Sequence, residues 1–395
     1  MGEPESVRCP AVVMTMNKAR SVLAAASGRK FVVWEIASNR VLYERELRAD
    51  LVPEPLIRSV TLYEPKEGGK LFCATAGDDK ILRVWDTSAA EPQGSSIAVP
   101  KRLTTVAFDQ ADFVTFADRF GDVFRVKMPL PTPITEDSLK PLPPPDKKKK
   151  KTGIEPPPRA AMTPEDSCIL GHCSMLTAMA LSPDETLIVT GDRDEHVRVS
   201  QYPEAYNIVS FCLGHLSSVF GLVFCGADNA RLCSGSGDGS LRLWRIRDGE
   251  ELACERPSGE NSIAIPCDWC EKTNTISAMV EGQNRVLLYT VDPAANTMKL
   301  SRTIEAPSPV LNALFDANGR VLVATASHGI QVFDQSSGAS IAAAFDDKAL
   351  GSCPAAAAKD IVAKYAYSLS KRPVYSRDGE RPQKRPCPGV AGDDD

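Results

Sequence analysis

Short runs of alternating apolar and polar residues recur along the chain, separated by turns rich in Gly, Asp and Ser. A period of two is typical of β-strands packed face to face, whereas an amphipathic helix repeats every 3.6 residues. The last clear strand of each group ends at a position that recurs along the chain. The residues at this position are Trp34, Trp85, Val126, Ser200, Trp244, Tyr289 and Phe333. Six of these seven residues are apolar, as a buried strand position requires. The pattern therefore predicts seven repeated β-units.

The two clearest units lie within residues 168–246. Each begins with a Gly-His pair, and His172 and His215 are 43 residues apart. The second unit ends in Ser240-Leu241-Arg242-Leu243-Trp244. A Gly-His opening and a closing Trp at this period are typical of a WD-repeat blade. We therefore expect an all-β fold, a seven-bladed WD-repeat β-propeller, over residues 1–346.

Four residues of the second unit are expected to form a hydrogen-bond relay that holds the blade together. They are His215, Ser236, Asp238 and Trp244, with His172 opening the same kind of relay in the preceding unit. Each partner would satisfy a buried polar group that otherwise costs about 1–3 kcal/mol. Gly239 permits a tight turn with positive φ. These residues are therefore interpreted as structural rather than catalytic.

The preceding unit departs from this pattern. Ser200 stands at the position of the Trp, so the relay cannot be completed, and Glu195 stands at the position of the turn Gly. The loop instead carries a run of ionisable side chains. We predict a partner-binding surface made of Asp192, Arg193, Asp194, Glu195 and Arg198. Asp194 aligns with Asp238 and is expected to accept a bond from His172. The alternative is a degenerate blade whose charged loop is merely solvated.

Two segments have compositions that do not support a packed core. Residues 129–165 are rich in Pro and contain five consecutive lysines, from Lys147 to Lys151. They are predicted to form a disordered insertion between blades three and four. Residues 347–395 are predicted to hold a short helix over 355–369 and then a disordered basic tail with Lys384 and Arg385. The five lysines fit a nuclear localisation signal, a phosphate-binding strap or a merely solvated loop, and the basic tail is typical of a nuclear signal; a nuclear location is therefore predicted, with the cytoplasm as the alternative. Either 340–345 or 7–10 could supply the strand that closes the ring.

The overall charge and motif content exclude several functions. The net charge is −5, and an acidic propeller body does not favour tight binding of nucleic acid by the propeller alone. The chain has no nucleophile elbow, no P-loop and no nucleotide or methyl-donor fingerprint, so no catalytic and no cofactor-binding residues are predicted. Cys267 and Cys270 resemble half a zinc site, but no second pair accompanies them, and no metal is predicted. No apolar run is long enough to span a membrane.

A narrower resemblance appears in blade four. The run from Asp192 to Ser200, Asp-Arg-Asp-Glu-His-Val-Arg-Val-Ser, is followed by Ser210-Phe211-Cys212-Leu213-Gly214-His215. These strings resemble the WD-repeat, non-catalytic subunit of the tRNA (guanine-N7)-methyltransferase. The resemblance is close over about 168–246 and weaker elsewhere.

That resemblance implies a function without chemistry of its own. In the family, the propeller binds a separate methyltransferase subunit that carries S-adenosylmethionine, and the heterodimer forms N7-methylguanosine in the variable loop of tRNA. The propeller stabilises its partner, reaches tRNA mainly through the complex, and meets the partner at the charged loop of blade four. The alternative is a generic WD-repeat adaptor, such as a ubiquitin-ligase substrate receptor. Such receptors commonly carry an Arg shortly after the Trp-Asp pair, whereas Trp85-Asp86 is followed by Thr87, Ser88 and Ala89.

Overall fold

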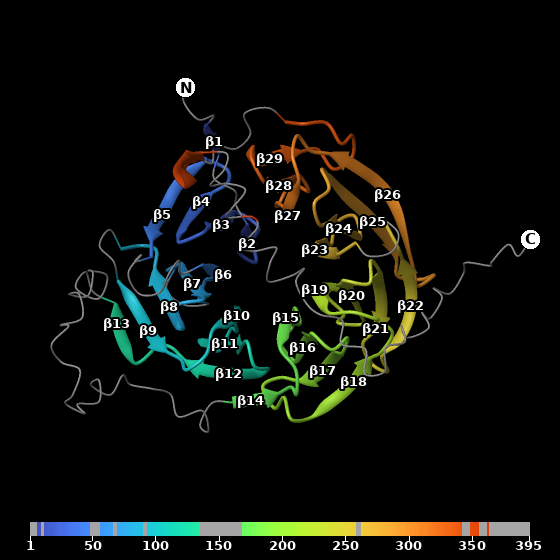
Figure 1. Cartoon of the computed structure of the whole chain (residues 1–395), viewed down its shortest axis with the longest axis horizontal. Helices are drawn as coiled ribbons and strands as arrows, with labels where there is room; N and C mark the ends of the chain where they lie inside the picture. Colours follow the sequence, from blue (N-terminus) through green and yellow to red (C-terminus); the bar gives the residue numbers. More distant parts are fainter. Residues whose placement is uncertain are drawn as a thin grey trace, which may run out of the picture.

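Seven β-sheets are arranged like blades around a central axis, as Figure 1 shows. The computed structural model describes residues 6–8, 12–47, 56–65, 69–89, 93–134, 168–257, 262–341, 348–354 and 362. Within each blade, successive strands pair antiparallel from the inside of the ring outward. The prediction of an all-β, seven-bladed propeller is confirmed. Among the described residues, no helix is long and apolar enough to cross a membrane.

The first four blades are built from consecutive strands, except that β13 joins blade two and blade three passes from β12 to β14. Blade one contains β2 (Val13–Met16), β3 (Val22–Ser27), β4 (Lys30–Glu35) and β5 (Arg40–Glu46). Blade two contains β6 (Ile57–Tyr63), β7 (Phe72–Gly77), β8 (Ile81–Asp86), β9 (Gly94–Ala98) and, outermost, β13 (Thr132–Ile134). Blade three contains β10 (Leu103–Phe108), β11 (Phe113–Asp118), β12 (Asp122–Lys127) and β14 (Cys168–Gly171). Blade four contains β15 (Leu176–Leu181), β16 (Leu187–Asp192), β17 (Val197–Gln201) and β18 (Ile208–Cys212).

The remaining blades follow the same order. Blade five contains β19 (Val219–Cys225), β20 (Arg231–Ser236), β21 (Leu241–Arg245) and β22 (Glu250–Glu255). Blade six contains β23 (Ala264–Cys270), β24 (Thr275–Val280), β25 (Arg285–Asp292) and β26 (Thr297–Glu305). Blade seven contains β27 (Val310–Phe315), β28 (Val321–Thr325) and β29 (Gly329–Phe333).

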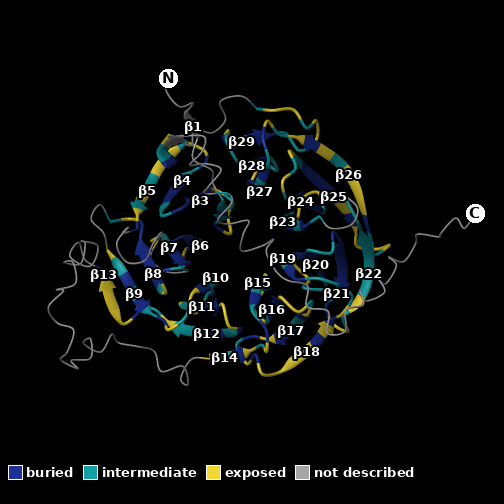
Figure 2. Ribbon diagram, in the orientation of Figure 1, coloured by how far each residue is buried: buried dark blue, intermediate teal, exposed yellow. Residues whose placement is uncertain are grey.

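The core lies between neighbouring blades. Between blades four and five, Val197 and Val199 of β17 pack in one cluster with Trp244 of β21, and all three are fully buried. Because side chains alternate across a strand, each sheet presents one apolar face to the blade before it and one to the blade after it. Figure 2 shows the consequence: second strands such as β3, β16 and β24 are buried almost throughout, and exposed residues gather on outermost strands such as β13, β18 and β26.

The Pro-rich insertion differs from its prediction in two ways. Its ends are β12 and β14, which pair with each other, so it lies inside blade three and not between blades three and four. Its first residues, 129–134, are ordered, because β13 pairs with β9 and extends blade two to five strands. Leu130 and Ile134 are buried there, and the burial of their side chains stabilises a short strand although prolines surround it. The rest of the predicted insertion, from 135, lies outside the described residues.

The ring closes where the start of the chain meets the segment after blade seven. β1 (Ser6–Arg8) pairs with β30 (Ser352–Pro354), while Ser340 bridges Phe333 at the outer side of blade seven. Between them, the short 3-10 turn η2 (Lys348–Leu350) buries Leu350 against blades one and seven. The packed part of the chain therefore extends beyond the predicted boundary at 346. The predicted helix over 355–369 lies outside the described residues, apart from the single residue 362.

Candidate functional site: the charged turn and outer strand of blade four

Blade five shows the complete relay against which blade four can be compared. Trp244 Nε1 donates to Ser234 Oγ at 2.7 Å, and this hydroxyl lies 2.6 Å from His215 Nε2. His215 Nδ1 lies 3.3 Å from Asp238 Oδ2, an acceptor that fixes Nδ1 as the protonated nitrogen. The predicted serine was wrong: the relay passes through Ser234, whereas Ser236 Oγ bonds the Ser217 carbonyl at 2.9 Å. The error is two residues, the interval that keeps a side chain on the same face of a strand.

Blade four keeps only half of this relay. His172 Nε2 lies 2.8 Å from Thr190 Oγ1, and Nδ1 lies 3.2 Å from Asp192 Oδ2. The expected acceptor, Asp194, was therefore wrong. Its carboxylate instead accepts a bond from Arg193 Nε at 3.1 Å, and its side chain is 53% exposed. The role of the turn aspartate has moved two residues toward the start of the turn.

Asp192 is consequently a structural residue and does not belong to the rim of an interface. Its side chain is buried, and Oδ1 accepts the backbone N–H groups of Asp194 and His196 at 2.9 and 3.0 Å. Burial works to raise the pKa of Asp192, but the hydrogen bonds from His172 and from the His196 backbone outweigh it and leave the pKa lowered. An ionised Asp192 thus organises the turn from inside.

With Asp192 turned inward, the next four side chains point outward. Arg193, Asp194 and His196 are exposed, and Glu195 is partly buried. Glu195 has a φ of 79°, a conformation that favours glycine, as expected from its alignment with Gly239. Burial and the neighbouring carboxylates Asp238, Asp194 and Asp192 raise its pKa against the opposing effect of His196. The fold does not require a carboxylate at Glu195, because glycine would adopt this backbone conformation without strain.

Arg198 lies below this turn, at the junction of blades three and four. Its Nε donates to Ser200 Oγ at 2.9 Å, its Nη1 to the Gly171 carbonyl at 3.3 Å, and its Nη2 to the Ala205 carbonyl at 2.8 Å. Burial lowers its pKa. In blade five, the Gly214 position that corresponds to Gly171 lies against the ring of Trp244. Arg198 therefore contacts Gly171, the residue against which a tryptophan ring would pack if blade four had one.

Two other arginines occupy the equivalent strand position, and both are neutralised inside their own blade. Arg83 Nη1 pairs with Asp79 at 2.5 Å, and Arg242 pairs with Glu251. Arg198 bonds only a hydroxyl and two carbonyls, and no carboxylate lies within ion-pair distance of it among the described residues. Its charge is therefore partly desolvated and unbalanced, a state that a carboxylate from another chain would relieve.

The outer strand of blade four adds a feature that the sequence reasoning missed. Five large apolar side chains are 38–73% exposed on β18 and beside its ends: Tyr206, Ile208, Val209, Phe211 and Leu213. The register places Phe211 opposite Arg198, so both side chains lie on one face of the sheet. The alternation was visible in the sequence, because Ser210 and Cys212 point inward and leave the apolar residues outside.

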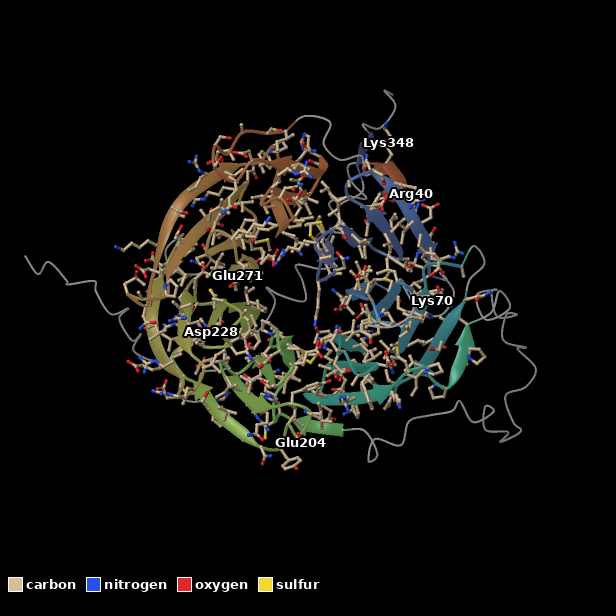
Figure 3. All side chains as sticks on the ribbon, turned by 180° about the vertical axis from the view of Figure 1, so that it is seen from behind. Arg40, Lys70, Glu204, Asp228, Glu271 and Lys348 are labelled. Atoms are coloured by element: carbon tan, nitrogen blue, oxygen red, sulfur yellow. The ribbon has the colours of Figure 1, made fainter. Side chains whose placement is uncertain are left out.

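Three features of blade four lie along its outer strands. The charged turn precedes β17, the apolar row lies on β18 and beside its ends, and the 202–207 loop at the other end of β17 accepts a bond from Arg198. Glu204, labelled in Figure 3, marks this loop at the outer edge of the molecule. Contiguous apolar surface next to charges is typical of a protein–protein contact. Among the described residues no cluster of three or more metal-ligating side chains exists, and Cys267 and Cys270 lie on β23 within the packing of blades six and seven.

Solved structures with similar backbones are all-β propellers of this kind. The "Structure of U3-55K" gives a TM-score of 0.60 at 15% sequence identity, covering 82% of this chain and 92% of that one. The "Crystal Structure of Mitotic Checkpoint Complex" contains a chain with a TM-score of 0.60 at 14% identity, covering 83% and 90%. At such identities the likeness concerns the fold alone. Together with the relay of blade five, it defines this chain as a WD-repeat β-propeller.

The sequence comparisons are more specific. Residues 135–341 match the family described as tRNA methyltransferase TRM82 WD40 domain. A relative from Dictyostelium discoideum, the tRNA (guanine-N(7)-)-methyltransferase non-catalytic subunit wdr4, is 25% identical over 80% of this chain and 68% of its own length. The non-catalytic subunit wuho of Anopheles gambiae is 36% identical over 41% of this chain and 43% of its own length. This chain belongs to that family of non-catalytic WD-repeat subunits and is not itself the methyltransferase.

Proposed function

We propose that the chain is the scaffold of a heterodimeric tRNA (guanine-N7)-methyltransferase and docks the catalytic subunit on blade four. Membership of the family of non-catalytic subunits supports the function, which is the formation of N7-methylguanosine in tRNA. The same membership disfavours a generic ubiquitin-ligase receptor. S-adenosylmethionine would then be held by the partner, and tRNA would be reached mainly through the complex.

The observation that carries the docking site is the unbalanced charge of Arg198 beside an exposed apolar row. Phe211 lies on the same sheet face as the arginine, and Leu213 follows directly after β18; their side chains are 41% and 55% exposed. Burying them against a partner would release about 25 cal/mol for each Å² removed from water. A partner carboxylate at Arg198 would then form a desolvated pair, whose truncation typically costs about 2–5 kcal/mol. Glu195 and Arg193, on the adjoining turn, would form the polar rim.

The experiment is co-expression with candidate catalytic subunits and measurement of affinity. Leu213→Ser should weaken the complex by about tenfold or more, since it removes a 55% exposed apolar side chain of the proposed surface. Leu300→Ser is the matched control, because Leu300 is 50% exposed on the outer strand of blade six. Equal affinities for the two variants would place the interface elsewhere on the ring.

For location in the cell, the nucleus is proposed from composition. Lys147 to Lys151 and the tail with Lys384 and Arg385 lie outside the described residues, so the argument rests on the runs of basic residues themselves. Neutralising both stretches should move the protein to the cytoplasm. Unchanged nuclear accumulation would contradict this proposal.

A further inference from the structure

A group of cations gathers at one end of blades two and three, where the chain enters strand β10 and where β11 turns into β12. We call this region the blade-three rim. It consists of four cationic residues and one aromatic residue: Lys80, Lys101, Arg102, Arg119 and Phe120. Two backbone bonds hold its parts together: Val99 N donates to the Lys80 carbonyl at 2.9 Å, and Arg119 N donates to the Arg102 carbonyl at 2.8 Å. The five residues therefore occupy one continuous edge although they come from three separate stretches of sequence.

The charges of this rim are largely available. Lys80, Arg102 and Arg119 are exposed, and none forms an ion pair among the described residues. Arg119 Nε points at Met175 Sδ at 3.3 Å, a weak acceptor that leaves the guanidinium charge unbalanced. Lys101 lies 3.5 Å from Asp122 and 3.9 Å from Asp118, so it is partly neutralised. The fold is acidic overall, which makes a local surplus of exposed cations a specific feature and not a general property of the surface.

An exposed aromatic ring lies among these cations. Phe120 is 64% exposed, and the ammonium group of Lys101 lies 4.2 Å from its ring centroid. The turn that presents it is rigid, since Asp118 Oδ1 accepts the backbone N–H groups of Phe120, Gly121 and Asp122 at 2.7–3.2 Å. A large apolar side chain held out into water on a fixed turn is not needed for packing. It offers one free ring face for stacking.

The rim also borders the central cavity of the propeller. This cavity has a volume of about 540 Å³ and is lined by Arg102 and Arg119 on the blade-three side. Arg58, which also lines it, is held by Asp78 at 2.8 Å. Arg102 and Arg119 thus border the cavity and are also exposed to solvent, where an elongated anion could contact both.

We infer that the blade-three rim binds an unpaired stretch of RNA, with the phosphates against Arg102 and Arg119 and one base stacked on Phe120. Exposed cations alone would suit any polyanion, but a polyanion with flat apolar groups is a nucleic acid strand whose bases are unstacked. This inference deepens the proposed function, because it assigns the propeller its own contact with tRNA. That contact would lie outside the docking surface on β18. Met175 links the two regions, because its sulfur contacts Arg119 and its carbonyl accepts a bond from Arg193 N at 2.9 Å.

The first test uses the full chain alone and a short fluorescent oligouridine at low salt. Arg102→Ala with Arg119→Ala should weaken binding by about tenfold or more. The slope of log affinity against log salt should also fall by about 1.4, at about 0.7 for each phosphate that is no longer neutralised. Phe120→Ala should weaken binding by about tenfold and leave that slope unchanged, because stacking does not release counterions. The matched control is Arg40→Ala with Arg247→Ala, which removes the same charge from side chains that are 68% and 82% exposed.

Several outcomes would overturn the inference. If the rim and control pairs lose affinity equally, binding is non-specific attraction to the whole surface. If polyglutamate competes as well as RNA and Phe120→Ala has no effect, the rim fits an acidic protein segment instead. Melting temperatures of all variants should stay within a few degrees of the wild type, since these side chains are exposed.

The second test separates this inference from the proposed function. In the complex with the catalytic subunit, the Arg102/Arg119 variant should keep its affinity for the partner and lose affinity for a tRNA transcript. If no catalytic subunit binds the chain, the proposed function fails while the oligouridine result still decides about the rim. If the partner binds and tRNA affinity is unchanged, the rim is not part of the tRNA contact.

Discussion

Arg198 donates its Nε–H to the hydroxyl of Ser200 at 2.9 Å, so the arginine folds over the residue that replaces the blade tryptophan. The two residues lie on the same face of β17, two positions apart. In blade five the same positions hold Arg242 and Trp244, and there the arginine is neutralised by Glu251. Loss of the indole and loss of the internal carboxylate therefore occur together in blade four. This coupling leaves the charge of Arg198 without a carboxylate of its own blade and therefore available to a partner.

Removing only the charge of Arg198 should separate its contribution to the stability of the propeller from its contribution to binding the catalytic subunit. Arg198→Met keeps an unbranched chain over Ser200, so we expect a loss of about 1–2 kcal/mol in the free energy of unfolding from the three hydrogen bonds. Affinity for the catalytic subunit should fall at least about tenfold. Arg198→Glu should cost more stability, because a carboxylate would face the carbonyls of Gly171 and Ala205. Chemical denaturation and titration calorimetry measure the two effects.

The comparison with Arg242→Met is the internal control for this variant. That substitution leaves Glu251 without its partner inside blade five and should reduce stability more than affinity. If Arg198→Met binds the catalytic subunit as tightly as the wild type does, Arg198 serves only the fold.

The corrected relay of blade five predicts a difference between two neighbouring serines. Ser234→Ala leaves Trp244 Nε1 and His215 Nε2 without a partner in a fully buried site, and we expect a loss of about 2–3 kcal/mol. Ser236→Ala removes the bond to the Ser217 carbonyl and the bond that Ser236 Oγ accepts from the Asp238 N–H at 3.2 Å, and it should cost about 1 kcal/mol. Denaturant unfolding of both variants, with unchanged m-values, would show which substitution lowers the free energy of unfolding more. The reverse order would restore Ser236 to the relay.

The same relay predicts how stability depends on pH. Burial lowers the pKa of His215 below its ordinary value of 6.5, against the opposing effect of the hydrogen bond that His215 donates to Asp238. The unfolded chain therefore takes up a proton near pH 6.5 while the folded chain does not, and the free energy of unfolding falls as pH drops below that value. For Asp238, burial raises the pKa, but the bonds from His215, Ser240 and Leu216 outweigh it and leave it lowered from 3.8. Its contribution is present above about pH 4 and is lost at lower pH.

Melting temperatures measured from about pH 8 to about pH 5 test the histidine contribution. The wild type should lose stability over this interval, and the His215→Gln protein, although less stable at the alkaline end, should lose less of it. Parallel curves for the two proteins would show that His215 does not titrate in this range. The other groups that act on His215 are Ser234, Ser240, Arg242 and Glu251. Arg242 lowers the pKa of the imidazole and Glu251 raises it, and these two charges pair with each other.

The sequence predicted the seven blades because each blade repeats an alternation that any buried sheet must have. It could not place β13, since a three-residue strand held by Leu130 and Ile134 leaves almost no periodic pattern. It misplaced Asp192 because alignment with blade five gives the position of a residue in a turn but not the direction of its side chain. It missed the apolar row because Phe211 and Leu213 look like core residues until the neighbouring blade is known to pack only against Ser210 and Cys212.

The turn between β2 and β3 provides the last prediction, since it binds across the ring. Arg20 of blade one donates to both oxygens of Asp268 in blade six, at 2.5 and 2.9 Å. It also donates to the carbonyls of Phe315 and Trp269, both at 2.7 Å. On the same turn, Lys18 pairs with Glu185 of blade four at 2.6 Å. One short turn therefore joins the first blade to strands that are distant in sequence, beside the point where the ring closes.

Arg20→Ala should accordingly weaken the whole ring and not one blade. The guanidinium is 31% exposed and Asp268 is 17% exposed, so the pair lies between a surface ion pair, worth about 0–1 kcal/mol, and a buried one, whose disruption costs about 3–5 kcal/mol. We expect a loss of about 2 kcal/mol in the free energy of unfolding. Arg40→Ala is the matched control, because Arg40 forms an exposed pair with Glu35 at 3.7 Å and should change stability by less than about 0.5 kcal/mol. Hydrogen exchange locates the effect: Arg20→Ala should speed exchange in blades one, six and seven together, because the same guanidinium holds all three. Faster exchange confined to blade one would mean that the turn only stabilises its own hairpin.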